Sequence, residues 1–297
     1  MAPAASPAEL TQRALRRWPL PAIAGDADKE SRGSVLVVAG SREIPGAALL
    51  AATAALRAGA GKLVIATAQS AAVQTAIAMP EARVIGLPET AQGAFAAGGL
   101  QLLEEVAREA DAALLGPGLA DEGGTVDFVT PLLPLLTHVP VVLDALAMNV
   151  LKRLGRVRQP VLLSPHAGEM AQLRGRPKKD IEADPLAAAQ ACADWGAVVV
   201  LKGGVTRIAS PDGRQWRHDC DHPGLATSGS GDVLAGLITG FAAQQASLEQ
   251  AAAWGVVLHA LAGARLARRL GPLGYLAREL PQEIPGLMKK LRRGEPG

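Results

Sequence analysis

A Gly/Ser-rich loop that runs directly into an apolar segment is the strongest chemical signal in the chain. It reads GLATSGSGDVLAG. Glycines let the backbone approach a ligand closely, and the free N–H groups at the start of a helix bind anions. No Gly-Lys-Ser/Thr follows, so this is not a Walker A loop. We expect an anion hole formed by Ser228, Gly229, Ser230 and Gly231.

Asp232 follows this loop and falls in the first turn of the expected helix, where the helix dipole favours its charged form. A carboxylate beside a bound phosphate can act as the general base on a nearby hydroxyl. The alternative is that Asp232 is only an acidic residue at a helix start and that the glycines only form a turn.

Polar residues also follow two other apolar runs. In SPHAGEM, His166 and Glu169 are three positions apart, so both can line one site, or they are a loop histidine and a helix-start acid. In DALAMNVL, Asp144 and Asn149 are either helix caps or ligand contacts. We include Asp144, Asn149 and Glu169 as supporting residues of the predicted site.

Two further strings carry cationic or metal-ligand side chains. In LKGGVTRI, Lys202 precedes two glycines, which is compatible with a phosphate contact or with a tight turn and a solvated lysine. In HDCDH, the side chains of His218, Cys220 and His222 share one face of an extended chain. Their spacing matches no standard zinc signature and a fourth ligand is not evident, so we predict no metal site there.

The elements that must position these residues alternate along the chain. Short β-rich runs predict strands at residues 33–40, 62–67, 83–87, 112–116, 140–145, 161–164 and 197–204. Ala/Leu-rich segments predict helices at residues 46–58, from about 70, 100–108, 125–136, 186–195, 230–245, 248–270 and near the C-terminus. A hairpin is predicted around residues 211–213.

The strands are apolar throughout, which is typical of a parallel sheet that is buried on both faces. We therefore predict an α/β fold with a doubly wound, mostly parallel central sheet and helices on both faces. Ligands of such sheets bind outside the carboxyl ends of the strands. The polar and Gly-rich signals fall at these ends: Gly40-Ser41, Gly116-Pro117-Gly118, Asp144, Pro165-His166 and Lys202-Gly203-Gly204.

Composition argues against several classes of partner. The 297 residues include 30 basic and 28 acidic side chains, for a net charge of +2, and no basic tract stands out. Only 3% of the residues are aromatic. These features favour neither nucleic acid nor a membrane surface as a partner.

Location and domain organisation follow from the rest of the chain. The longest apolar stretch, residues 251–264, is too short to cross a bilayer, and the N-terminus has no secretory h-region. The two cysteines, Cys192 and Cys220, favour a reducing compartment. We expect a cytoplasmic protein in which residues 1–27 form an extension or first helix and residues 28–297 form one domain.

The motifs in this order resemble the NAD(P)H-hydrate dehydratase family, which has a ribokinase-like fold. The matching strings are GSVLVVAGS, PGAALLAATAALRAGAGK, LLGPGL, DALAMN, SPHAGEM, LKGGVT and ATSGSGDVLAG. They run from about Asp28 to the C-terminal helix. The length resembles the single-domain bacterial form without the epimerase domain, which is ADP-dependent.

The resemblance implies a role for each matching position. Contacts to the hydrated nicotinamide nucleotide are implied for Ala47, Gly118, His166 and Asp232. Contacts to the adenine nucleotide are implied for Lys202, Gly203, Gly204, Val205, Thr206 and Gly231. Three positions depart from the family pattern, namely Ala120, Ala167 and His222.

The resemblance also implies a reaction. The 6-hydrate of NADH or NADPH, as its S epimer, is phosphorylated by ADP, with Asp232 as the base on its hydroxyl. Phosphate then leaves as the ring double bond reforms, and AMP is released. The resemblance implies that the anion hole stabilises the transferred phosphoryl group. It also implies that Mg²⁺ bridges the phosphates, mostly through water.

The resemblance further implies a separate epimerase as functional partner and a homotetramer. The alternative reaction is that of a ribokinase-like small-molecule kinase for hydroxymethylpyrimidine or a thiazole alcohol. A catalytically silent nucleotide-binding protein of the same fold is the third reading. The residues leave the choices of ADP or ATP, and of NADH or NADPH hydrate, open.

Overall fold

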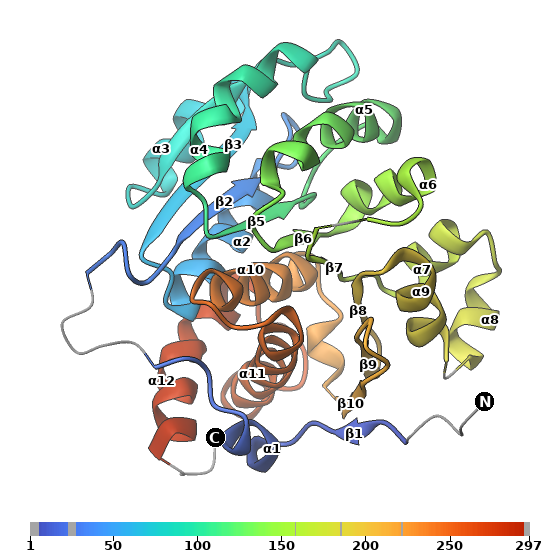
Figure 1. The fold of residues 1–297 in the computed structure, drawn as a ribbon. Helices are drawn as coiled ribbons and strands as arrows, with labels where there is room; N and C mark the ends of the chain where they lie inside the picture. The colour runs from blue at the N-terminus through green and yellow to red at the C-terminus, as the bar shows by residue number, and fades with distance from the viewer. Residues whose placement is uncertain (1–5, 23–27, 158, 185, 221, 294–297) are drawn as a thin grey trace.

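A ten-stranded sheet runs through the molecule in the order β1-β10-β9-β8-β7-β6-β5-β2-β3-β4 (Figure 1). The computed structural model describes residues 6–22, 28–157, 159–184, 186–220 and 222–293. The strands are β1 (Ala8–Glu9), β2 (Ser34–Val38), β3 (Lys62–Ala68), β4 (Arg83–Leu87), β5 (Ala112–Leu115), β6 (Val141–Leu143), β7 (Val161–Leu163), β8 (Val198–Leu201), β9 (Val205–Ala209) and β10 (Gln215–Asp219).

The sheet is mostly parallel. Both strand pairs that include β9 are antiparallel, and the other pairs are parallel. The turn between β9 and β10 falls at the predicted hairpin, where Gly213 adopts a φ of 88°. The predicted α/β fold with a mostly parallel central sheet is therefore confirmed.

The central strands β5, β6, β7 and β8 are apolar throughout because both faces of the sheet are buried there, whereas β4 and β10 near its edges carry exposed polar side chains. In β2, Val35 and Val37 belong to one apolar cluster, whereas Leu36 and Val38 belong to the other. Side chains of successive strand residues point to opposite faces, so an alternating polar pattern has no place here.

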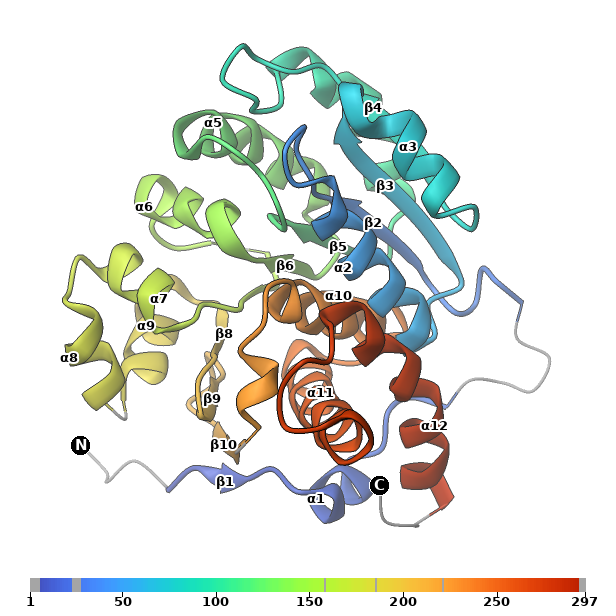
Figure 2. The ribbon, with the colours of Figure 1, turned by 180° about the vertical axis from the view of Figure 1, so that it is seen from behind.

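Helices cover both faces (Figures 1 and 2). Apolar side chains of α1 (Gln12–Arg17), α2 (Pro45–Ala58), α10 (Ser230–Ala243), α11 (Leu248–Leu270) and α12 (Leu280–Arg293) fill the first cluster. Those of α4 (Glu104–Glu109), α5 (Glu122–Leu132), α6 (Val150–Leu154), α7 (Ala167–Arg174), α8 (Lys178–Ala183) and α9 (Ala187–Trp195) fill the second. Helix α3 (Ala72–Ala78) packs against β4.

Helices α2 and α10 approach each other at backbone distance. A Cβ at Gly236 would lie 2.1 Å from the carbonyl oxygen of Ala51, and one at Gly240 would lie 2.6 Å from that of Ala55. Only glycine fits at such a crossing without moving a helix. This contact fixes α10, and with it the position of the helix start that carries the Gly/Ser-rich loop.

The N-terminal segment joins the same sheet and core. Strand β1 pairs with β10 in parallel, with Ala8 opposite Trp216. In the segment that follows, Leu15 is fully buried, and Trp18 stacks on Trp216 with ring centroids 5.6 Å apart. Within the described residues, the structure contains no helix with the length and hydropathy needed to cross a bilayer.

Most predicted elements differ from the observed ones by a few residues at their ends, and two of these differences have a clear physical reason. The helix expected at residues 100–108 begins only at Glu104, because Ala97–Leu103 form a tighter 3₁₀ turn. Gly99 packs there against Leu87, so close packing shapes this turn. The strand expected to reach residue 204 ends at Leu201, and two exposed glycines then lead into β9.

Candidate active site

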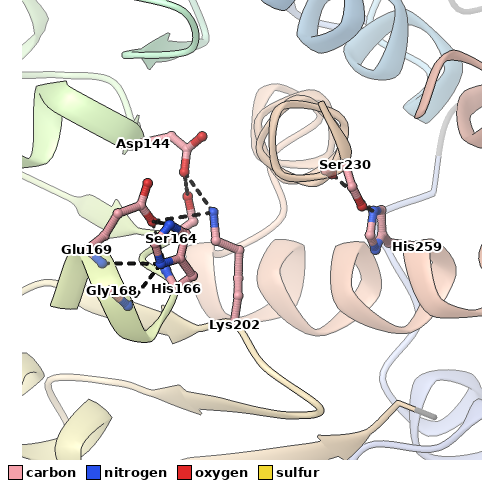
Figure 3. A network of polar contacts seen from close by, with 8 residues as sticks. All are labelled: Asp144, Ser164, His166, Gly168, Glu169, Lys202, Ser230 and His259. Carbon is pink, nitrogen blue, oxygen red and sulfur yellow. Dashed lines mark hydrogen bonds and ion pairs between the residues drawn. The ribbon is translucent and has the colours of Figure 1, made fainter. Parts of the chain in front are cut away.

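Polar side chains from several strand ends converge on the start of α10 (Figure 3). Asp144 follows β6, His166 follows β7, and Lys202 follows β8. These strands are neighbours and run parallel, so their carboxyl ends meet at one edge of the sheet. The strand-end residues that the sequence singled out therefore lie in one place.

The Gly/Ser-rich loop turns sharply into α10. Gly229 is the N-cap residue and adopts a φ of 86°, which favours glycine. A Cβ there would also lie 2.4 Å from Cδ1 of Leu50 on α2. Ser230 and Gly231 form the start of the helix. The backbone N–H of Ser230 donates a 3.2 Å bond to the carbonyl oxygen of Thr227, whereas that of Gly231 has no partner within the helix and is available to an anion.

Lys202 is the centre of an ion-pair network beside this loop. Its Nζ lies 3.0 Å from Oδ1 of Asp144 and 3.9 Å from Oε2 of Glu169. Ser164 donates a second hydrogen bond of 2.7 Å to the same oxygen of Asp144. Burial alone would lower the pKa of Lys202, but the charges of Asp144 and Glu169 outweigh it and raise that pKa above its ordinary value.

The ammonium group of Lys202 also reaches the start of α10. A Cβ at Gly231 would lie 3.2 Å from Nζ of Lys202. The cationic side chain and the free backbone N–H groups therefore border the same space. Such an arrangement suits an anionic ligand such as a phosphate.

Asp232 is half-buried on the first turn of α10. Burial raises its pKa to about 7, with a further increase from the negative charge of Asp144 and a partly opposing effect from Lys202. A carboxylate with a pKa near neutrality can accept a proton and remain available in its charged form. The helix dipole by itself favours the charged carboxylate, so the rise in pKa comes from burial and from the charge of Asp144.

The helix-cap alternative fails for Asp144 and Asn149. Each precedes a short helical turn, and neither side chain caps that turn in the described structure. Asp144 is instead buried with its carboxylate on Lys202 and Ser164. Asn149 is buried at the junction of that turn with α6.

His166 and Glu169 form a capping box at the start of α7. Nδ1 of His166 accepts hydrogen bonds from the backbone N–H groups of Gly168 and Glu169, at 2.9 and 3.2 Å. Oε2 of Glu169 accepts a 2.8 Å bond from the backbone N–H of His166. The local reading as a loop histidine and a helix-start acid is correct, and both residues also face Lys202. Ala167 is the first residue of this helix.

A cavity of about 620 Å³ opens beside the network and the start of α10. Its walls include these predicted site residues: His166, Lys202, Gly203, Gly204, Thr206, Ser230 and Gly231. Val205 lines an adjacent hollow of about 480 Å³, which shares Lys202, Gly203 and Gly204 with the cavity. Residues that are close in sequence thus lie on both sides of the turn that follows β8.

Ala47 and Gly118 lie together where the start of α2 meets the turn after β5. A Cβ at Gly118 would lie 2.6 Å from Cβ of Ala47 and 2.7 Å from the carbonyl oxygen of Ile44. Gly118 has a φ of 65°, so a larger residue would be both strained and crowded there.

The histidines and the cysteine of HDCDH line the cavity. Nδ1 of His218 lies 2.8 Å from the carbonyl oxygen of Leu10, so this nitrogen donates to the N-terminal segment. Asp221 lies outside the described residues, and among those described no group of three metal-ligating side chains comes together. That this segment holds no metal stays a prediction.

Two residues near the site were missed by sequence reasoning. His259 on α11 lines the cavity, and its Nε2 lies 3.0 Å from Oγ of Ser230. Ser164 holds Asp144 from the end of β7. A lone histidine in an otherwise apolar helix was the available signal for the first, and a serine at a strand end for the second.

Comparison with known proteins agrees with this geometry. The family described as NAD(P)H-hydrate dehydratase matches residues 35–286. The solved structure of the ADP/ATP-dependent NAD(P)H-hydrate dehydratase of Bacillus subtilis, co-crystallised with ATP/Mg²⁺, is 30% identical. It superposes with a TM-score of 0.83 and covers 97% of this chain and 100% of that one.

Two curated relatives extend the comparison. The ADP-dependent (S)-NAD(P)H-hydrate dehydratase of Xanthomonas campestris is 49% identical, over 96% of this chain and 97% of that protein. The bifunctional NAD(P)H-hydrate repair enzyme Nnr of Moorella thermoacetica is 41% identical over 93% of this chain, which spans only 53% of that relative. With matches of this extent, and a ribokinase-like sheet beneath them, the chain belongs to the NAD(P)H-hydrate dehydratase family.

Proposed function

We propose that this protein repairs hydrated nicotinamide nucleotides. It dehydrates the S epimer of the 6-hydrate of NADH or NADPH to NAD(P)H, uses ADP as phosphoryl donor, and releases AMP and phosphate. The observation that carries this proposal is Asp232, a carboxylate with a pKa of about 7 at a helix start that can hold a phosphate. The name of the 49% identical relative supports the substrate and the donor.

The cavity beside α10 is the proposed adenine-nucleotide site. Lys202 supplies a cation, and the two glycines after it leave room for a phosphate chain to approach the backbone. Thr206, Val205 and Gly231 complete the proposed nucleotide contacts. The backbone N–H groups of Ser228, Gly229 and Gly231 would form the anion hole for the transferred phosphoryl, because that of Ser230 already donates to Thr227.

The hydrated nicotinamide would lie on the other side of Asp232. Ala47 and Gly118, which contact each other, would form a small-residue wall against its ring. His166 would contribute its Nε2–H, because its Nδ1 already accepts two backbone hydrogen bonds. Asp144, Glu169 and Asn149 are proposed as supporting residues, the first two through their hold on Lys202.

The proposed chemistry has two steps. Asp232 takes the proton of the C6 hydroxyl while the oxygen of that hydroxyl attacks the β-phosphorus of ADP. The bond from that phosphorus to AMP breaks. The C6–O bond then breaks and phosphate leaves, while water takes a proton from C5 and the C5–C6 double bond reforms. Hydroxide is a poor leaving group and phosphate is a better one, which is why the donor is needed.

The residues fit a Mg²⁺ ion that is held mainly by its nucleotide. Mg²⁺ prefers oxygen ligands and typically uses one or two carboxylates together with phosphates and water. Asp144 and Glu169 offer such oxygens beside Lys202, while the described residues hold no three-ligand cage. When bound, the ion would neutralise charge on the phosphates.

The proposed substrate and donor suggest a wider context. A separate epimerase that interconverts the two hydrate epimers would supply the S form. We further propose a cytoplasmic location, from the cysteine content and the apolar pattern of the sequence, and a homotetramer, from the family resemblance.

Product analysis tests the proposal directly. The chain is incubated with enzymatically prepared NADH hydrate and either ADP or ATP, and the reduced-nicotinamide absorbance band is followed. Recovery of NADH with stoichiometric AMP and phosphate is the expected result, with much slower turnover on ATP. A stable phosphoester of a small alcohol would point to the kinase alternative, and equal or faster turnover with ATP would overturn the donor assignment alone.

A further inference from the structure

His259 is a buried polar residue on the long apolar helix α11. The helix reads LEQAAAWGVVLHALAGARLARRL, and the residues on either side of His259 are buried and apolar. Its Nε2 lies 3.0 Å from Oγ of Ser230 and 3.1 Å from the backbone carbonyl oxygen of Ser230 (Figure 3). One nitrogen of the imidazole therefore contacts two polar atoms of Ser230.

The geometry fixes where the protons lie. A carbonyl oxygen only accepts hydrogen bonds, so the 3.1 Å contact requires a proton on Nε2. Burial lowers the pKa of His259 to about 4, so the ring is neutral near pH 7 and this is its one N–H group. An unprotonated Nε2 would instead direct its lone pair at the carbonyl oxygen.

The hydroxyl of Ser230 is left free to donate. The single Nε2–H is shared between the carbonyl oxygen and Oγ of Ser230. Oγ therefore accepts a hydrogen bond from the ring, and the hydroxyl proton points elsewhere. Ser230 and His259 both line the cavity, together with Gly231 and Lys202. Ser230 is also the first residue of α10, so its side chain and the free backbone N–H groups border the same space.

We propose that His259 is a positioning residue that orients the Ser230 hydroxyl as a hydrogen-bond donor to a phosphate oxygen of the bound nucleotide. The inference rests on the proposed function for the identity of that nucleotide. A neutral ring performs this role without adding a charge beside Lys202. His259 lines the cavity too, but the proposed role is exerted through its hydrogen bond to Ser230.

Substitution of His259 separates positioning from packing. His259→Leu removes the N–H donor, whereas His259→Gln can place an amide N–H at a similar reach. Gln250→Leu is the matched control, because Gln250 lies on the same helix and donates 2.7 and 3.4 Å bonds to the backbone of Pro19 and Trp18, away from the cavity. Each variant is assayed for ADP affinity by calorimetry, for kcat and KM with NADH hydrate, and for Tm.

His259→Leu is expected to weaken ADP binding about 10- to 100-fold, the typical effect of losing one hydrogen bond to a charged group. His259→Gln should recover most of that affinity. Gln250→Leu should lower Tm and leave ADP affinity unchanged. Wild-type affinity in His259→Leu, or an equal loss in the Gln250 control, would overturn the proposal.

Ser230→Ala guards against a His259→Leu variant that does not fold. It removes the hydroxyl and leaves the apolar packing of α11 intact, so it should lose a similar amount of ADP affinity. Unchanged affinity in this variant would equally overturn the proposal. A wild-type chain that binds ADP but does not dehydrate the hydrate would overturn the proposed reaction and leave His259 in place. A wild-type chain that does not bind ADP would overturn both.

Discussion

The start of α10 has a charged flank and a neutral flank, and burial acts on them in opposite directions. On the charged flank, Asp232 faces Lys202 and Asp144, and burial raises the pKa of its carboxyl to about 7. On the neutral flank, His259 contacts Ser230, and burial lowers the pKa of its imidazole to about 4. One flank thereby keeps a base close to its working pH, while the other holds a donor that carries no charge.

Loss of the carboxylate on the charged flank should have the largest effect. Asp232→Asn keeps the size of the side chain and removes the base, so turnover should fall by about 10²–10⁴-fold or more. ADP affinity should change little, or increase slightly, because a negative charge beside the phosphates is removed. Rate measurements at saturating ADP test this, with Asp127→Asn in an exposed ion pair as the control. An Asp232→Asn enzyme with most of its turnover would remove Asp232 from the mechanism.

Crowding the space between the two flanks should affect binding as well as turnover. In Gly231→Val, the new Cβ would lie 3.2 Å from Nζ of Lys202, and its methyl groups would extend into the nucleotide space. Overpacking of this kind typically costs about 1–3 kcal/mol, which corresponds to about 5- to 150-fold in ADP affinity. Calorimetric titration with ADP measures it. Gly123→Ala, at an open position on α5, should bind ADP like the wild type.

The pH profile should move in opposite directions when the charges around Asp232 are removed. The carboxylate form is needed as the base, so kcat/KM of the wild type should rise with pH through about 7. Asp144→Asn removes a negative charge that raises the pKa of Asp232, so this limb should move to lower pH. Lys202→Met removes a positive charge that lowers it, so the limb should move to higher pH. Shifts of the same sign in both variants would show that Asp232 does not set this limb.

Stability against pH gives the most specific contrast. The pKa of Asp232 is about 7 when folded and 3.8 ordinarily, so the native state binds more protons, and its contribution to stability falls as pH rises between these values. The pKa of His259 is about 4 when folded and 6.5 ordinarily, so its contribution rises with pH in that window.

Denaturant unfolding at a series of pH values checks both signs. Asp232→Asn should become more stable than the wild type as pH rises from about 4 to 7. His259→Gln should lose stability relative to the wild type from about pH 4 to 6.5. If both differences had the same sign, the contrast between the flanks would not hold.

The predictable part of the site is the part that depends on local sequence. The Gly/Ser-rich loop and Asp232 lie within one helix start. Backbone conformation explains the glycines there, and the helix dipole explains an acidic residue in the first turn. The strand ends were found because apolar strands end at glycine or polar residues. Gly118 and Lys202 were therefore placed at the correct edge of the sheet before any contact was known.

Contacts between distant segments could not be predicted from the sequence. Lys202 is 58 residues from Asp144, and the alternatives of solvated lysine and helix cap were equally compatible with each string alone. His259 is 29 residues from Ser230 and lies on an apolar stretch that indicates only burial. Strand β1 has two residues, too few for a periodic signal, and exists because β10 offers it a partner.

Strand β1 closes an edge of the sheet that would otherwise be open to other chains. Its parallel pairing occupies β10, and the backbone N–H of Leu10 donates a further 2.8 Å bond to Arg217. An uncovered edge with Trp216 on it would be a template for aggregation. The segment also holds His218, whose ring lines the cavity. Proteolytic loss of this short strand should therefore reduce solubility and loosen one wall of the nucleotide site in a single event.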